Sequence, residues 1–299
     1  MPSLKDLVNR RKAVQSTKKI TLAMKMIAAA KLRKAQDKVS ATRPYSQHME
    51  RMVQELAARS HTFERPPQLL LGNGQTERHR LLIITANRGL CGNFNTAVIR
   101  RAIAIVQELR KENKASPQLV CVGQKGRDIL RASPYEPLLE GYISSSDKPS
   151  YRQAQEIARQ LQEAFEGGAF DTCSIIFNHF ISAMRQEVTI HQLIPYAPLK
   201  EPASNRTGMA SPEALPYFEF EPHEEAVLGQ LLPQNLAVQI YQVLLESSAS
   251  EHGARMTAMD GASRNADTMI RALQMRYNRM RQHYITKELI EIISGAEAM

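Results

Sequence analysis

The segment Asn87–Asn93, with the sequence NRGLCGN, comes nearest to a chemical signature in this chain. It stands between an apolar run and a helix-forming stretch, which is where phosphate-binding loops occur. A Walker loop, however, ends in Gly-Lys followed by Ser or Thr, whereas this segment continues as Gly92-Asn93-Phe94 and does not fit GxGxxG. We therefore interpret it as a tight structural turn, and a nucleotide-binding α/β enzyme remains an alternative.

The cysteines, histidines and carboxylates form no recognisable catalytic or metal-binding pattern. Cys91, Cys121 and Cys173 are far apart and lack CxxC spacing, so we expect reduced, partly buried thiols. The eight histidines contain no HExxH pair, and His252 and His283 are expected to be surface or partner-contact residues. The sequence thus predicts no catalytic residue, no metal site and no cofactor.

The elements that would position this turn alternate between strand and helix patterns. Short apolar runs predict strands at 80–85, 118–123, 174–180 and 188–193. Amphipathic stretches between them predict helices at 96–112, 125–131 and 151–165. This alternation predicts a small, mostly parallel sheet covered by helices, followed by an irregular connection at 195–222.

Long helix-forming segments flank this middle part, from about Ser3 to Ser60 and from about Pro222 to Ser294. Pro44 and Pro233 are the only prolines inside these segments, and we expect them near helix boundaries. At 1.5 Å per residue each segment could extend roughly 80 Å or more, far beyond a helix inside a compact domain. The two segments are therefore predicted to pack together as a coiled coil.

The first helix carries apolar residues at alternating spacings of three and four: Leu4, Leu7, Val14, Ala28, Leu32, Ala35, Val39, Met49, Val53 and Leu56. Arg11, Lys18, Thr21 and Lys25 interrupt this seam. A homodimeric zipper would keep its seam apolar, so the N-terminal half should face something other than a symmetric copy. The matching seam of the last helix turns small and polar midway: Leu236, Ile240, Val243, Ser247, Ser250, Ala254, Thr257 and Gly261.

The net charge of +9 is concentrated in residues 1–43, where only Asp6 and Asp37 oppose twelve basic residues: Lys5, Arg10, Arg11, Lys12, Lys18, Lys19, Lys25, Lys31, Arg33, Lys34, Lys38 and Arg43. Such a helix needs an acidic partner, which could be nucleic acid, an anionic membrane surface or a carboxylate-lined protein. The Leu/Ala/Met stripe favours protein packing, and nucleic-acid binding stays as an alternative. No apolar stretch reaches the roughly 20 residues of a membrane span, and we expect a mature, cytoplasm-facing protein.

Several motifs resemble those of the gamma subunit of rotary F-type, proton-translocating ATP synthase, in its bacterial form. They are KITLAMKMIAAAKLRKAQ at 19–36, RGLCG at 88–92, ASEHGARMTAM at 249–259, YNRMRQ at 277–282 and ITKELIEIISGA at 285–296. They run in order along essentially the whole chain, and the terminal ones are highly specific.

The resemblance implies an antiparallel coiled coil of helices 1–60 and 223–299, with a Rossmann-like α/β foot domain, 61–222, inserted between them. It implies a non-catalytic central-stalk rotor that couples proton-driven rotation of the membrane c-ring to ATP synthesis or hydrolysis on the beta subunits. The implied partners are three alpha and three beta subunits, an epsilon subunit and the c-ring, with no nucleic acid. The implied place is the cytoplasmic face of the bacterial inner membrane, as a peripheral protein.

The same resemblance assigns partner-binding residues in this sequence. Contacts with the alpha–beta ring would fall on Met24, Lys25, Arg255, Arg281, Gln282, Thr286, Glu288 and Glu291. Contacts with epsilon and the c-ring would fall on Tyr217, Phe218, Glu219 and Phe220.

Overall fold

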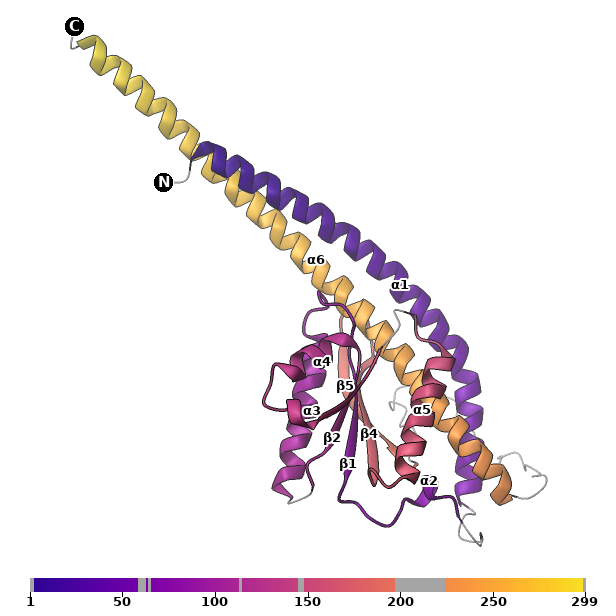
Figure 1. The fold of residues 1–299 in the computed structure, drawn as a ribbon. Coiled ribbons are helices and arrows are strands. Elements are labelled where there is room, and N and C mark those ends of the chain that lie inside the picture. The colour runs from indigo at the N-terminus through magenta and orange to yellow at the C-terminus, as the bar shows by residue number, and fades with distance from the viewer. Residues whose placement is uncertain are drawn as a thin grey trace. The chain divides into compact units, whose positions relative to one another are not determined.

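The computed structural model describes residues 3–58, 63, 66–112, 115–144, 148–196 and 224–297. The chain forms two compact units, one made of Met1–Ala30 with Arg255–Met299 and the other of Lys31–Ala254. We call them the helix-pair unit and the α/β unit. Two long helices, α1 (Leu4–Ala58) and α6 (Glu224–Glu297), contribute residues to both (Figure 1). The long terminal helices predicted from the sequence are therefore present.

Pro44 and Pro233 lie inside α1 and α6, so the prediction that they stand near helix boundaries is wrong. A proline removes one backbone hydrogen bond of a helix. Each long helix here continues through that loss, because its apolar side chains still pack on both sides of the proline. Val53 and Leu56 of α1, for example, are completely buried against Leu228 of α6 within the α/β unit.

The α/β unit contains a five-stranded sheet in the order β3-β2-β1-β4-β5. Its strands are β1 (His79–Ile84), β2 (Gln118–Val122), β3 (Leu139–Ile143), β4 (Thr172–Phe180) and β5 (Gln186–Ile194). The first four strands run parallel to one another, and β5 pairs antiparallel with β4. This confirms the mostly parallel sheet. The apolar runs in the sequence did not predict β3, because this edge strand is only partly buried and carries no continuous apolar run.

Helices cover both faces of the sheet (Figure 1). One face packs against α3 (Phe94–Lys111) and α4 (Gln124–Arg131), and the other against α5 (Tyr151–Glu166) and the first half of α6. Along β1, Leu81 and Ile83 point to the first face and Leu82 and Ile84 to the second. A strand that is buried on both faces needs apolar residues at every position, which explains the unbroken apolar run in the sequence. A short helix, α2 (Gln68–Leu71), precedes the sheet.

The attachment of α6 to the sheet can be tested with two substitutions in the same helix. Ile240 is completely buried against the sheet, whereas Ile290 is 58% exposed. We expect Ile240→Ala to lower the free energy of unfolding by about 2–5 kcal/mol. Ile290→Ala should change it by less than about 0.5 kcal/mol. Urea unfolding followed by circular dichroism and tyrosine fluorescence would measure both, and equal losses would contradict this packing.

Candidate functional site

The loop between β1 and α3 is a closed turn rather than an open cradle. Leu90 and Gly92 adopt positive φ angles of 62° and 59°. The side chain of Asn95 ties the turn together, because its Oδ1 accepts from the Ala86 backbone N–H at 2.9 Å and its Nδ2 donates to Cys91 Sγ at 3.3 Å. Cys91 is only 1% exposed. The loop therefore uses its polar groups to hold itself in place, as a structural turn does.

This turn also contacts α6. Ala86, Cys91 and Phe94 form an apolar cluster with Ala254. The small size of Ala254 and of its neighbour Gly253 permits this close approach. A Cβ atom built on Gly253 would lie 3.4 Å from Ala183, at the turn between β4 and β5. Gly253 and Ala254, two small residues of α6, thus lie where this helix packs closely against two turns of the α/β unit.

The packing of α6 also determines how exposed one of its histidines is. His252 is 6% exposed, so the prediction that it is a surface residue is wrong. It is buried because α6 passes against the α/β unit at this point. His283, in contrast, lies in an exposed part of α6, as predicted.

The buried titratable groups of the α/β unit have structural roles. Burial would raise the pKa of Asp171, but hydrogen bonds from Arg78 and Asn73 outweigh it and hold this pKa well below its ordinary value. The Asp171 carboxylate accepts from Asn73 Nδ2 and Arg78 Nη2, both at 2.7 Å, so it is saturated with donors. Burial lowers the pKa of His191 to about 4. Neither group is poised to exchange protons with a substrate near neutral pH.

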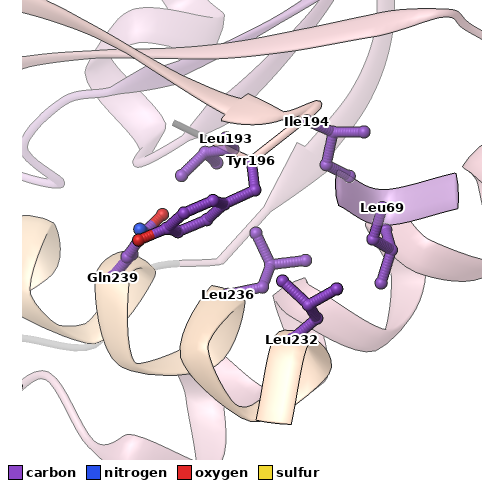
Figure 2. Close-up of a pocket in the computed structure, with 7 residues that line it drawn as sticks. All are labelled: Leu69, Leu193, Ile194, Tyr196, Leu232, Leu236 and Gln239. Carbon is purple, nitrogen blue, oxygen red and sulfur yellow. The ribbon is translucent and has the colours of Figure 1, made fainter. Parts of the chain in front are cut away.

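One cavity of the α/β unit lies beside β5, the strand that carries His191. A small cavity of about 10 Å³ lies between α2, β5 and α6, and Figure 2 shows the side chain of Tyr196 reaching across it toward Gln239. Such a space holds about one water molecule. Among the residues that the structure describes, no group of three or more His, Cys, Asp or Glu side chains could hold a metal ion. None of the described helices is long and apolar enough to cross a membrane.

In the helix-pair unit, the polar residues that interrupt the α1 seam face α6. Lys18 Nζ lies 2.6 Å from Asp267 Oδ1, and Lys25 Nζ lies 2.6 Å from Asp260 Oδ1. The hydrogen bond from Lys25 lowers the pKa of Asp260. The side chain of Arg11 donates to Gln274 Oε1. The structure thus confirms that this half of the seam does not face a symmetric copy: its partner is the other end of the same chain, running antiparallel.

The residues predicted to bind an alpha–beta ring fall into two groups. Met24, Lys25 and Arg255 are half-buried in the helix-pair unit. The others are exposed and lie together near the end of α6: Arg281, Gln282, Thr286, Glu288 and Glu291. The predicted foot residues, Tyr217, Phe218, Glu219 and Phe220, lie outside the described residues.

The exposed end of α6 also carries apolar side chains that the sequence alone does not assign to a partner. Every residue from 281 to 294 is exposed. Six large apolar residues here are 43–68% exposed: Tyr284, Ile285, Leu289, Ile290, Ile292 and Ile293. The signal was available in the sequence, because the apolar pattern of α6 continues beyond the length that α1 can cover. An apolar surface of this extent is typical of a protein interface.

Comparisons with known proteins agree with this architecture. A family model described as ATP synthase matches residues 3–299. An ATP synthase gamma chain from Rhodospirillum rubrum is 48% identical over 302 residues, which cover 100% of both chains. The chain belongs to the ATP synthase gamma chain family. A second gamma chain, from Paramagnetospirillum magneticum, is 46% identical over 300 residues and also covers 100% of both chains.

Solved structures show the same fold. The central stalk and c-ring structure of Tetrahymena thermophila mitochondrial ATP synthase contains a chain that is 27% identical, with a TM-score of 0.60. The match covers 82% of this chain and 99% of that one. A rotor chain of the Euglena gracilis enzyme matches with a TM-score of 0.62 at 19% identity, covers 94% and 98% of the two chains, and supports the fold alone. As a gamma chain, this protein is a non-catalytic subunit of the central-stalk rotor and part of the ATP synthase complex.

One contact between α6 and the sheet should depend on pH. His179 Nδ1 lies 2.6 Å from Glu246 Oε2, and the two side chains are 25% and 13% exposed. The hydrogen bond with Glu246 raises the pKa of His179, while burial opposes the rise. Glu187 of β5 also raises this pKa, and Arg43 of α1 lowers it. Because the pKa is higher in the folded state, the contact stabilises the protein fully below the unfolded pKa of about 6.5.

We therefore expect His179→Gln to cost about 1.5–3 kcal/mol of unfolding free energy at acidic pH, the contribution of a hydrogen bond to a charged group. The difference from the unsubstituted chain should shrink as the pH rises through the folded pKa of His179. Urea unfolding between about pH 5.5 and 9 would measure it. His48→Gln, at an exposed position of α1, is the matched control. A His179→Gln effect that is constant with pH would contradict the protonated contact.

Proposed function

We propose that this chain is the rotating shaft that couples proton-driven rotation of a membrane c-ring to ATP synthesis or hydrolysis on beta subunits. The observation that carries this proposal is the end of α6. Residues 281–294 form a helix that α1 does not cover and that exposes apolar side chains. Such an end requires a surrounding protein surface, and a ring of three alpha and three beta subunits would provide a sleeve for it.

We propose that residues 1–60 and 223–299 act as the shaft and residues 61–222 as the foot. In this division the foot would rest on an epsilon subunit and the c-ring, with Tyr217, Phe218, Glu219 and Phe220 among its contacts. The chain would then sit at the cytoplasmic face of the bacterial inner membrane and would meet the membrane only through the c-ring. Nucleotide chemistry would stay on the beta subunits, which suits a chain whose phosphate-loop-like segment is a closed turn.

The contact residues on the shaft would serve in two ways. Arg281, Gln282, Thr286, Glu288 and Glu291 would offer charged and hydrogen-bonding groups beside the apolar surface. Charge complementarity of this kind sets register and orientation more than affinity, which suits a shaft that must move past each subunit in turn. Met24, Lys25 and Arg255 would contact the ring in the part of the helix pair that is farther from the exposed end of α6. An acidic group of the ring would have to share Lys25 with Asp260, which already lies 2.6 Å away.

Reconstitution tests this function directly. Purified alpha and beta subunits of a related bacterial enzyme would be mixed with and without this chain, and Mg-ATP hydrolysis and particle mass would be measured. We expect a large gain in activity and one copy of the chain in a three-plus-three assembly. A folded chain that neither assembles nor raises activity would overturn the proposal, and salt-dependent nucleic-acid titration would then test the alternative.

The contact residues can be tested in the same assembly. Arg281→Ala with Gln282→Ala should lower its ATP hydrolysis about tenfold or more, because lost hydrogen bonds to charged groups are each worth about 1.5–3 kcal/mol. The unfolding of the isolated chain should not change, since both side chains are exposed. Arg279→Ala, at another exposed arginine of α6, is the matched control. Equal activities for the two variants would remove Arg281 and Gln282 from the proposed contact.

A further inference from the structure

The polar contacts of the helix-pair unit follow a regular ladder. Arg11, Lys18 and Lys25 are spaced seven residues apart on α1, and their partners on α6 are Gln274, Asp267 and Asp260, which step back by seven residues each time. We call these three contacts the rungs. A spacing of seven is the repeat of a coiled coil, so the rungs occupy one side of its seam. Their regularity means that they belong to a single antiparallel register.

The apolar core between the rungs is thin. Among the residues of the helix-pair unit that the structure describes, the buried ones are Leu7, Thr21, Ala28, Met259, Ser263 and Ala266. Four of the six are small or polar, so the area that they remove from water is limited. In the α/β unit, by contrast, Val53 and Leu56 of α1 are completely buried against large apolar residues. The helix-pair unit therefore depends more on its polar contacts than the α/β unit does.

The rungs are partly open to solvent and favour one register. The side chains of Lys18 and Asp267 are 37% and 41% exposed, so salt screens their attraction. A shift of the helices by one heptad would place Arg11 opposite Arg281. A shift in the other direction would place Lys25 opposite Gly253, while Arg11 and Lys18 would still meet Asp267 and Asp260. Each shift would lose one of the three contacts, and the first would also bring two arginines together, so the rungs favour the observed register by a modest margin.

We propose that the rungs of Arg11, Lys18 and Lys25 make the helix-pair unit a charge-dependent zipper. They hold residues 4–30 of α1 against α6 in one register. The pairing loosens when the charges are screened or removed, while the α/β unit stays folded. The consequence for a rotor rests on the proposed function: this section of the shaft would have a stiffness set by three polar contacts rather than by a dry apolar core.

Spin labels on the full chain test the zipper. Gln15→Cys and Met269→Cys place labels at exposed positions, about one turn from the Lys18–Asp267 rung. The native thiols, Cys91, Cys121 and Cys173, are buried. Pulsed electron paramagnetic resonance would give the distance distribution between the labels. We expect it to be narrow at low salt and to broaden toward longer distances as the Debye length falls from roughly 10 Å at 0.1 M to roughly 3 Å at 1 M.

Substitutions at one rung separate charge from helix packing. Lys18→Glu should broaden the distribution already at low salt, and Lys18→Glu with Asp267→Lys should narrow it again. Lys18→Met with Asp267→Leu should make the distribution less sensitive to salt, because an apolar pair is not screened whereas the Lys25–Asp260 pair still is. Lys12→Glu makes the same charge change at an exposed α1 position away from the seam and should have no effect.

A narrow distribution that neither salt nor Lys18→Glu changes would overturn the proposal, as would a charge swap that fails to restore it. The measurement uses the isolated chain and needs no partner subunit. Failure of the zipper therefore leaves the reconstitution test intact. A chain whose label distances respond to salt and charge as expected, but which does not assemble with alpha and beta subunits, would instead count against the proposed function.

Discussion

The burial of α6 against the sheet is the interaction on which the rest of the structure depends. Leu236, Ile240 and Val243 join the same apolar core as strands β1, β2 and β4 and helix α5. This core fixes one stretch of a 74-residue helix, and the remainder of the helix can then serve other purposes. A helix of this length gains most of its stability from packing of this kind rather than from its own propensity.

Along its length α6 meets three kinds of neighbour. Large apolar residues such as Ile240 contact the sheet, small residues at Gly253 and Ala254 admit the β1–α3 turn and the β4–β5 turn, and acidic residues at Asp260 and Asp267 meet lysines of α1. From residue 281 onward its side chains are exposed. The contacts of α6 thus change from hydrophobic to electrostatic along the length of one continuous helix. This order suits a subunit that is anchored at one end and makes changeable contacts at the other.

The β1–α3 turn illustrates why a local pattern is weak evidence for chemistry. A parallel strand followed by a glycine-containing turn and a helix is the geometry of a phosphate-binding loop. The same geometry here carries Asn95, which bonds back to Ala86 and Cys91, and a buried face that receives Ala254. The Asn95 side chain thus holds the turn together, and the apolar face of the turn packs against α6. The turn accordingly serves the packing of the α/β unit.

The sequence by itself determined the two long helices, four of the five strands and the polar interruption of the α1 seam, because apolar periodicity and charge placement are local properties of the chain. Its motifs also carried the family resemblance. Only the tertiary structure decided that β3 completes the sheet, that His252 is buried and that Lys18 and Lys25 meet Asp267 and Asp260. Each of these depends on residues far apart in sequence. The exposure of the α6 end is likewise decided by where α1 begins, and not by α6 alone.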